Sequence, residues 1–485
     1  MCGAPSVGWP VVVDDASLSA AQRRLVTELL RLSPVLGEAG RAFANAGHEL
    51  HLVGGSVRDA LLGRSSNDLD LTTDARPEQV LALIGDRPSW TTGIEFGTVG
   101  VQYGEHRMEI TTYRADRYDR ISRKPEVVYG DSLAADLARR DFTINAMAFS
   151  VQDDTFTDPH GGLADLLARR LRTPGTAEDS FADDPLRMLR AARFVSQLGV
   201  VPAPAVLTAI AGMAEQLARI SPERVQGELT KLILGADPRP ALELMVDSGL
   251  ATPVLPELPA LRLEIDEHHQ HKDVYAHSLT VLERAIALED TGPDLVLRLA
   301  ALLHDIGKPA TRRHEPQGRV SFHHHEVVGA RKVRDRLRAL RFPRDVVRDV
   351  EQLTFLHLRF HGYGQGAWTD SAVRRYVVDA GPLLDRLHKL VRSDCTTRNE
   401  RRARMLSATY DALEERIAAL KEREDLDAVR PDLDGTAIME LLGLPAGPLI
   451  GRAWRHLKAV RLERGPLSRE DAEAELRRWA AGNLP

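Results

Sequence analysis

Cysteine is nearly absent from the 485-residue sequence, which contains only Cys2 and Cys395, far apart and without metal-type spacing. The scarcity argues against a disulfide framework and against a thiolate zinc site, and it favours a reducing compartment. The sequence also lacks an apolar run long enough to cross a bilayer, and its first residues contain no basic segment followed by an apolar core. We therefore expect a cytoplasmic protein with no membrane partner.

Aromatic residues make up only 5% of the chain, and neither sign of charge dominates, since 64 Lys and Arg are balanced by 70 Asp and Glu for a net charge of −6. This balance argues against a uniformly basic nucleic-acid binder, although a basic stripe can lie within an acidic total. With 43% hydrophobic residues the composition is that of a globular protein. At this length several domains in series are expected.

The texture of the sequence changes along the chain. Residues 49–150 contain short apolar and β-branched runs separated by Gly, Asp and Pro, which predicts a sheet with intervening helices. Amphipathic helical patterns then continue almost without interruption to the end, so the predicted fold is α+β, a small sheet domain followed by a long helical body. The expected divisions are an N-terminal helical segment (1–48), a sheet head (49–170), a helical neck (171–255), a second helical domain (256–400) and a helical tail (401–485).

Asp68 and Asp70, in the segment NDLDLTT, are candidate metal ligands. Successive side chains alternate in a strand, so the two carboxylates point to one face while the leucines beside them point to the core. Such a pair suits Mg²⁺, which binds through one or two carboxylates plus substrate phosphates. Upstream, an apolar strand ends at Gly54 and Gly55, where small residues let backbone N–H groups approach a phosphate, and Arg58 follows in the next helix.

Alone, a D-x-D pair or a Gly-Gly turn is commonly an ordinary surface feature. Together they resemble motif A of the DNA polymerase beta nucleotidyltransferase superfamily. The resemblance implies a nucleoside triphosphate site. Alternation in RMEITTY puts Glu109 on one face with Thr111, where Glu109 is either a third catalytic carboxylate or a solvated strand residue.

A second series of motifs follows, namely RRDFTINAMA at 139–148, then DPHGG, DDPLRMLRAARF and SPERVQGEL. In this order they resemble motifs B to E of the class II CCA-adding enzymes and their bacterial poly(A) polymerase relatives, over about residues 50–235. The resemblance implies ribose and triphosphate contacts by Arg139, Arg140, Asp141 and Asn145. Asp183 stands where the family often has Glu, which is a conservative departure.

Asp184 and Arg187 are the candidate residues for selecting the incoming base. They are three residues apart, so on a helix they would project from one face. A carboxylate beside a guanidinium matches the donor and acceptor order of cytosine and adenine, and it opposes that of uracil and guanine. The resemblance implies this template role; without it, a surface ion pair would be the ordinary interpretation. Arg190 and Arg193 continue the same helical face and are either substrate-facing or solvated.

Within residues 255–400, the segments HSLTVLERA, LLHDIGKPAT, FHHHEVVGA, TFLHLRF and LVRSDCTTRN resemble the HD phosphohydrolase superfamily. The resemblance implies a divalent-metal site whose ligands are His277, His304, Asp305, His325, His357 and Asp394. His325 and His357 correspond to the additional histidines of two-metal members. Imidazole and carboxylate together suit several divalent ions, so the identity of the metal stays open. Lys308 either contacts a substrate phosphate or caps the helix end.

Two segments have both a plain and a functional interpretation. Residues 113–133 are rich in Arg and Asp and resemble by position the family's flexible loop, which rearranges between C and A addition; an ordinary exposed loop is the alternative. Residues 401–485 predict either a helical bundle with solvated charges, the plainer interpretation, or a tail that holds tRNA by its phosphates.

The function expected from these resemblances is template-independent addition of C, C and A to the 3′ end of tRNA from CTP and ATP, with Mg²⁺ at the D-x-D pair. A phosphohydrolase activity of the HD domain is a further expectation. The alternatives are poly(A) addition, addition of CC or A alone, and a metal-dependent HD phosphohydrolase with a degenerate head. The intact D-x-D and RRDFT motifs oppose a degenerate head, and the domain order opposes an alarmone synthetase/hydrolase, in which the HD domain comes first. No obligate protein partner is evident, and the natural HD substrate and the oligomeric state stay open.

Overall fold

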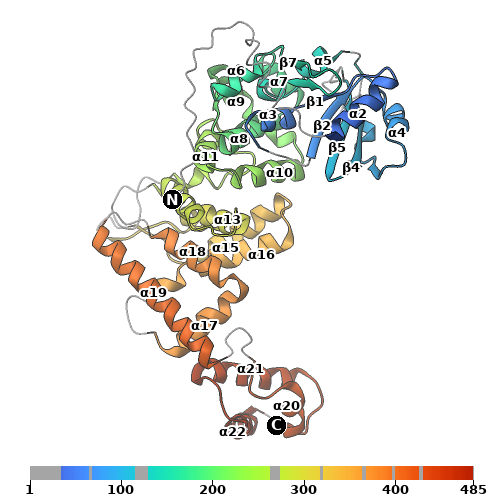
Figure 1. Ribbon diagram of the computed structural model, residues 1–485. Helices are drawn as coiled ribbons and strands as arrows, with labels where there is room; N and C mark the ends of the chain where they lie inside the picture. Colours follow the sequence, from blue (N-terminus) through green and yellow to red (C-terminus); the bar gives the residue numbers. More distant parts are fainter. Residues whose placement is uncertain are drawn as a thin grey trace, which may run out of the picture. The chain divides into compact units, whose positions relative to one another are not determined.

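The computed structural model describes residues 34–64, 68–114, 129–130, 132–262, 273–316, 320–362, 368–395, 399–424 and 430–483 (Figure 1). The chain divides into two compact units. The first contains residues up to Ser221 together with Gly235–Pro253, and the second contains Pro222–Leu234 together with the residues from Val254 onward. Segments of the expected neck, 171–255, thus occur in both units. Among the described residues, no helix is both long and apolar enough to cross a membrane.

A seven-stranded mixed sheet forms the centre of the first unit. Its strands are β1 His51–Val53, β2 Asp68–Thr73, β3 Ser89–Trp90, β4 Thr98–Tyr103, β5 His106–Thr112, β6 Ala148–Ser150 and β7 Phe156–Thr157. Their spatial order is β3-β4-β5-β2-β1-β6-β7, in which only the β2–β5 pair is parallel. The strand-rich region predicted at 49–150 is therefore present, and the two-residue strands β3 and β7 complete the two edges of the sheet.

Helices accompany the sheet and then replace it. Around the strands lie α2 Pro34–Asn45, α3 Gly55–Leu61, α4 Pro77–Ile84, η1 Ile94–Phe96, α5 Leu133–Ala138, η2 Thr143–Asn145 and α6 Gly162–Leu167. The remaining helices of this unit are α7 Ala177–Asp183, α8 Leu186–Leu198, α9 Pro204–Met213, η3 Ala214–Arg219 and α11 Pro238–Asp247. A short parallel pair, β8 Arg170–Leu171 with β9 Val201–Pro202, interrupts the stretch that was predicted to be helical.

The described residues of the second unit are helical apart from one small antiparallel pair of strands, β10 Arg313–His314 with β11 Val320–Ser321. Its helices up to residue 395 are α10 Pro222–Ile233, η4 Pro259–Leu261, α12 Val274–Ala287, α13 Leu295–Leu303, α14 Lys308–Thr311, α15 His325–Ala339, α16 Arg344–Leu356, η6 Arg359–Gly362, α17 Asp370–Ala380, η7 Gly381–Leu383 and α18 Leu384–Asp394. Helix α13 is buried on nearly all sides and packs against α10, α12, α16 and α18. An all-round apolar helix of this kind marks the centre of a core.

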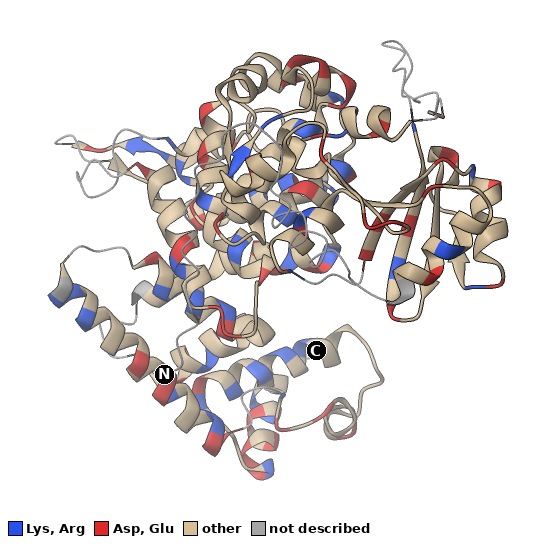
Figure 2. Cartoon of the chain, turned by 45° about the horizontal axis from the view of Figure 1, so that its top comes forward, with Lys and Arg blue, Asp and Glu red and all other residues tan. Residues whose placement is uncertain are grey.

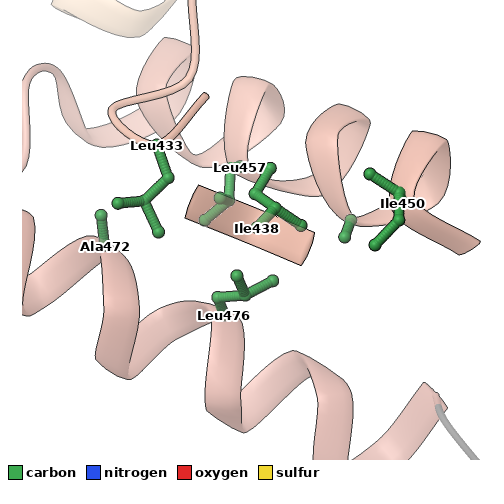
Figure 3. Close-up of a cluster of buried hydrophobic side chains, with 7 residues drawn as sticks. Leu433, Ile438, Ile450, Leu457, Ala472 and Leu476 are labelled. Atoms are coloured by element: carbon green, nitrogen blue, oxygen red, sulfur yellow. The ribbon is translucent and has the colours of Figure 1, made fainter. Parts of the chain in front are cut away.

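The chain continues in α19 Glu400–Arg423, α20 Gly435–Leu442, α21 Pro448–Arg464 and α22 Arg469–Asn483. The last three helices enclose a small apolar core, in which Leu433, Ile438, Ile450, Leu457 and Leu476 converge (Figure 3). Acidic and basic residues are interspersed over the chain without one sign prevailing (Figure 2). The predicted fold class, a sheet head followed by a long helical body, is confirmed.

Candidate active site and metal centre

Three carboxylates lie side by side on neighbouring strands of the sheet. The parallel register of β2 and β5 pairs Asp70 with Glu109 and Asp68 with Arg107. Asp68, Asp70 and Glu109 are all exposed, whereas Leu69 between the two aspartates is buried. Adjacent strands are about 4.8 Å apart, so the three side chains project together from one face of the sheet. The alternation expected from the sequence is confirmed for all three residues.

The surroundings of Asp70 favour the binding of a cation. Although the residue is exposed overall, the protein packed around its carboxylate raises the pKa of Asp70 above the usual value. Arg140 and Arg58 lower that pKa, while the neighbouring charges of Glu109 and Asp68 raise it. Three like charges on one face repel one another, and a divalent cation between them would remove that repulsion.

The Gly54–Gly55 turn at the end of β1 lies beside Asp70. Gly54 has φ +67° and ψ −134°, a backbone conformation that is open essentially to glycine alone. A Cβ at Gly54 would lie 3.1 Å from Nη1 of Arg140 and 3.7 Å from Oδ2 of Asp70. One residue into α3, the Ser56 hydroxyl accepts a 2.8 Å hydrogen bond from the Asp70 N–H. The turn therefore holds helix, carboxylate and arginine within contact distance.

We expect Gly54→Ala to weaken nucleotide binding by more than its backbone strain explains. Ala at positive φ costs about 1–3 kcal/mol, and the methyl group would also displace the Arg140 guanidinium. Gly85→Ala is the matched control, because Gly85 has nearly the same φ and ψ, 61° and −141°, with nothing within 4 Å of its Cβ position. Thermal unfolding of both variants should shift alike, whereas CTP affinity should fall only in Gly54→Ala. Equal CTP affinities would contradict the proximity argument.

A buried polar network joins α3, η2 and α8. Arg58 Nη1 donates a 2.7 Å hydrogen bond to Oδ1 of Asn145, whose amide donates at 3.0 Å to Oδ1 of Asp141. The other Asp141 oxygen accepts from Nε and Nη2 of Arg190, at 2.8 and 2.5 Å. Burial would raise the pKa of Asp141, but Arg190 and Asn145 hold it well below its usual range. The network brings together four of the predicted nucleotide-binding residues.

Arg139 and Arg140 are both held by Asp136, a residue that the sequence reasoning missed. Asp136 lies in α5 and is fully buried. Its Oδ1 accepts from Nη2 of Arg139 at 2.8 Å, and its Oδ2 accepts from Nη2 of Arg140 at 2.9 Å. The i, i+3 and i, i+4 spacing in DLARR was a usable signal for these pairs, although the burial was not.

The predicted geometry of Asp184 and Arg187 is wrong in one respect. Asp184 has an extended backbone, φ −144° and ψ 100°, between α7 and α8, and α8 begins only at Leu186. The two residues therefore do not lie on one helix. Asp184 Oδ1 accepts the Leu186 N–H at 3.2 Å, while Arg187 donates at 2.7 Å to the carbonyl of Arg139 and at 2.9 Å to Oγ of Ser180.

Arg190 and Arg193, which the sequence left as either substrate-facing or solvated, are both held by protein groups. Arg190 donates to Asp141, and Arg193 is buried with its guanidinium 4.4 Å from the Phe194 ring centroid, so Arg193 is not a solvated residue.

The predicted flexible loop lies mostly outside the described part of the chain. Of the segment 113–133, residues 115–128 and 131 lie outside the described residues. The described ends are joined by a bridge between Arg114 and Tyr129.

In the second unit, all six predicted HD residues converge. They are His277 on α12, His304 and Asp305 directly after α13, His325 at the start of α15, His357 directly after α16, and Asp394 at the end of α18. Their ligand atoms form two groups, within each of which the atoms lie no more than 4.8 Å apart: His277, His304 and Asp394; and Asp305, His325 and His357. The Asp305 carboxylate connects the groups, because its Oδ2 lies 3.2 Å from Nε2 of His304 and its Oδ1 lies 3.2 Å from Nε2 of His325.

The ring orientations fit metal ligation. His304, His325 and His357 each direct Nδ1 to the carbonyl oxygen three residues earlier, at 2.9, 2.9 and 2.6 Å. Their Nε2 atoms are buried and point toward the Asp305 carboxylate, at 3.2 Å for His304 and His325 and 4.0 Å for His357. A backbone acceptor on one ring nitrogen fixes the tautomer in which the other nitrogen can bind a metal.

The charges of the cluster are strongly coupled. Burial would lower the pKa of His304, but Asp305 and Asp394 raise it to about 10. Burial lowers the pKa of His357 to about 3, with His304 acting in the same direction. Lys308 Nζ lies 2.9 Å from Oδ2 of Asp305, so the lysine reaches into the centre of the cluster and does not simply cap a helix. Two carboxylates among several imidazoles provide a suitable set for divalent cations.

Comparisons with known proteins agree with this organisation. Residues 50–172 match the family "Poly A polymerase head domain", residues 199–261 match "Probable RNA and SrmB- binding site of polymerase A", and residues 274–407 match "HD domain". Among curated relatives, the CCA-adding enzyme of Levilactobacillus brevis is 43% identical over 42% of this chain and 51% of its own length. That of Lacticaseibacillus paracasei is 40% identical over 48% of this chain and 58% of its own. The chain thus spans about half the length of the curated relatives it matches.

Solved structures extend the likeness over nearly the whole chain. The Bacillus stearothermophilus CCA-adding enzyme in complex with CTP is 26% identical, with a TM-score of 0.67, and the match covers 93% of this chain and 98% of that one. The Thermotoga maritima CCA-adding enzyme complexed with tRNA has the same fold at 18% identity, with a TM-score of 0.58 and coverage of 94% and 98%.

The fold and the matched segments define a polymerase-type nucleotidyltransferase head joined to an HD domain. In its head, its RNA-binding segment and its HD domain, the chain is similar to tRNA nucleotidyltransferases and poly(A) polymerases that have an HD domain in the body. A polymerase head domain and an HD domain together imply dependence on divalent metals, and the HD domain contains two groups of candidate ligands.

Proposed function

We propose that this chain adds C, C and A stepwise to the 3′ end of tRNA, using CTP and ATP and releasing pyrophosphate. The observation that carries the proposal is the shared face of Asp68, Asp70 and Glu109, with Arg140 and the Gly54 turn beside it. The matched CCA-adding enzymes, one solved with CTP and another with tRNA, support the choice of substrates.

In this proposal Asp68 and Asp70 hold Mg²⁺, with Glu109 as a third carboxylate. Bound Mg²⁺ would lower the barrier to attack of the RNA 3′-hydroxyl on the α-phosphorus and neutralise charge on the leaving pyrophosphate. Arg140 and Arg58 lie close enough to Asp70 to act on its charge, so they are suited to bind the triphosphate. The Gly54 and Gly55 backbone would allow the phosphates to approach closely.

Base selection is assigned to Asp184 and Arg187. Both are half-buried, and Arg187 is held by Ser180 and by the Arg139 carbonyl. Contacts to the ribose and triphosphate, direct or through neighbouring side chains, are assigned to Arg139, Asp141, Asn145 and Arg190. We assign residues 49–170 as the head, 171–255 as the neck that contains the selecting residues, 256–400 as the HD domain and 401–485 as an RNA-binding tail.

The test uses tRNA transcripts that end before the CCA sequence, with Mg²⁺ and each NTP alone or CTP with ATP. We expect CTP alone to add two residues and the mixture to add three and then stop, as resolved on a denaturing gel at single-nucleotide resolution. A long ladder with ATP alone would identify poly(A) addition, and an arrest at two residues in the mixture would identify partial addition. Hydrolysis of nucleotides without any addition would favour an HD phosphohydrolase with an inactive head.

A second candidate activity, hydrolysis of phosphate esters by the HD domain, is favoured by the paired metal groups around Asp305. We expect Asp305→Ala to lower the divalent metal content and to abolish hydrolysis of a generic phosphodiester, while Asp68→Ala leaves this hydrolysis unchanged. Metal content is measured by mass spectrometry after dialysis, and hydrolysis with bis-p-nitrophenyl phosphate in Mn²⁺. His323→Ala is the control, because this exposed histidine belongs to the same run of three as His325. Unchanged metal content in Asp305→Ala would remove the site from consideration.

A further inference from the structure

Asp136 has an unusual environment for a residue outside the expected site. Its side chain is 0% exposed, yet it lies among donors from three parts of the head. Besides Arg139 and Arg140, the Thr72 hydroxyl of β2 lies 3.5 Å from Oδ2, and the Arg114 N–H lies 3.4 Å from Oδ1. Burial would raise the pKa of Asp136, but Arg140 and Arg139 lower it below the usual value.

One chain of contacts leads from Asp136 through Arg140 to the proposed catalytic carboxylates. Arg140 donates through Nη2 to Oδ2 of Asp136 at 2.9 Å, and its Nη1 lies 3.1 Å from the Cβ position of Gly54. Arg140 also has the strongest charge interaction with Asp70, which it stabilises in the ionised form. One guanidinium nitrogen is thus fixed by Asp136 while another faces the turn where the proposed triphosphate would lie.

The other chain of contacts leads from Asp136 toward the base-selecting residues. Arg139 donates through Nε at 3.1 Å and Nη2 at 2.8 Å to Oδ1 of Asp136. The Arg139 carbonyl in turn accepts the 2.7 Å hydrogen bond from Nη2 of Arg187. Two short links therefore join a single buried carboxylate to both sides of the site.

Stability alone is a weak reason for this arrangement. A buried ion pair often contributes no more than well-packed apolar residues of similar volume, because desolvation offsets the charge attraction. Positioning is a stronger reason, since a displacement of about 1 Å in a catalytic group can cost about 10²-fold in rate.

We propose that Asp136 is a positioning residue that sets Arg140 for the triphosphate and, through the Arg139 main chain, Arg187 for the base. This inference rests on the nucleotidyl-transfer function proposed above. It predicts that one buried carboxylate governs both the affinity for the incoming nucleotide and the selection among nucleotides.

The variant Asp136→Asn keeps the shape of the side chain and removes its charge. We expect KM for CTP and ATP to rise about 10- to 100-fold, with a smaller change in kcat, and the preference for CTP and ATP over UTP and GTP to fall. The affinity for tRNA should be unchanged. The matched control is Asp165→Asn, because Asp165 is also 0% exposed and accepts from Nε of Arg170 at 2.6 Å and Nε of Arg172 at 2.8 Å. A purely structural role predicts the same kinetic effect in both variants, and that result would overturn the proposal.

A double-mutant cycle with Arg140→Gln tests the route of the effect. If Asp136 acts on the triphosphate through Arg140, then Asp136→Asn should raise KM little further once Arg140 is changed. If the two substitutions instead raise KM by independent factors that multiply, Asp136 does not act through Arg140. Should Asp136→Asn fail to fold, Arg139→Gln and Arg140→Gln test the two chains of contacts separately, because both change half-buried side chains. In that case unchanged CTP binding in Arg140→Gln, with unchanged nucleotide preference in Arg139→Gln, would overturn the proposal.

CTP binding without tRNA, measured by equilibrium dialysis with Mg²⁺, separates this inference from the proposed function. If the wild type binds CTP and Asp136→Asn binds it more weakly, yet no nucleotide is added to tRNA, the positioning role stands and the proposed function fails. If the wild type adds nucleotides and a folded Asp136→Asn variant has an unchanged KM, the positioning role fails alone. A wild type that binds no CTP would overturn both.

Discussion

Asp68→Ala and Asp70→Ala are each expected to lower nucleotide addition to tRNA by at least about 10³-fold. Loss of a ligand removes stabilisation of the developing charge on the α-phosphate and pyrophosphate, and about 4 kcal/mol of that stabilisation corresponds to this factor. Neither variant should unfold. The two carboxylates repel each other and Glu109, so removing one relieves repulsion within the free protein.

The measurement is single-turnover addition of C to a truncated tRNA at millimolar Mg²⁺, with thermal unfolding recorded for each variant. Glu78→Ala provides a control, because Glu78 is an exposed carboxylate in the first turn of α4. Glu109→Ala should reduce the rate less than either aspartate variant, since a third ligand assists a two-metal site without being indispensable. Near-wild-type rates in both aspartate variants would exclude this face of the sheet as the active site.

The local features of this face could be predicted from sequence because they depend on neighbouring residues. Alternation in a strand separates Asp68 and Asp70 from Leu69, and it does the same for Glu109 and Met108. The pairing of β2 with β5, in contrast, does not depend on neighbouring residues in the sequence. It joins residues about 40 positions apart, and the register Asp70 to Glu109 depends on packing across the whole sheet. For that reason the third carboxylate could be proposed from sequence but not located.

The six candidate ligands of the HD domain illustrate the same division. The resemblance of the sequence segments to the HD superfamily indicated all six residues, because such a resemblance is carried by residue types within short segments. Which residues share a group, and the position of Asp305 between the two groups, follow from the packing of five helices. The contacts from Nδ1 of His304 and His357 to carbonyls three residues earlier arise because both residues lie at helix C-terminal ends, where carbonyls lack helical partners.

The sequence contained a signal that would have predicted the backbone conformation of Asp184 correctly. Pro185 follows Asp184, and a residue before proline is driven from the helical region toward extended backbone. Proline itself is favoured at the start of a helix. The observed φ of −144° at Asp184 and the start of α8 at Leu186 agree with both rules. A pair spaced i, i+3 therefore lies across a helix start and not along a helix face.

The template hypothesis is compatible with this correction. Arg187, the second residue of α8, is held at Nη1 and Nη2 by Ser180 and by the Arg139 carbonyl. Asp184 Oδ1 accepts the backbone N–H of Leu186. The positions of both side chains are therefore fixed by the surrounding chain. Such fixed donors and acceptors are what discrimination by hydrogen bonding requires.

We expect Asp184→Ala and Arg187→Ala to relax nucleotide selection and not merely to slow the reaction. With U or G in the site, the Asp184 carboxylate would face a carbonyl and the Arg187 guanidinium would face an N–H. Each unmatched buried polar group costs about 1–3 kcal/mol, so two together discriminate by roughly 10²- to 10⁴-fold. Removing the carboxylate relieves the repulsion against U and G, and it also removes hydrogen bonds to C and A.

The decisive quantity is therefore the ratio of kcat/KM for CTP and ATP to that for UTP and GTP, measured in the wild type and in both variants. The ratio is insensitive to a general loss of active protein, which matters because Arg187→Ala also removes donors from Ser180 and from the Arg139 carbonyl. Asp183→Ala is the control, since Asp183 is the exposed neighbour at the end of α7. If all four kcat/KM values fall by one factor in Asp184→Ala and Arg187→Ala, these residues only position the chain. A relaxed ratio in Asp183→Ala instead would move the template role to Asp183 and Arg190.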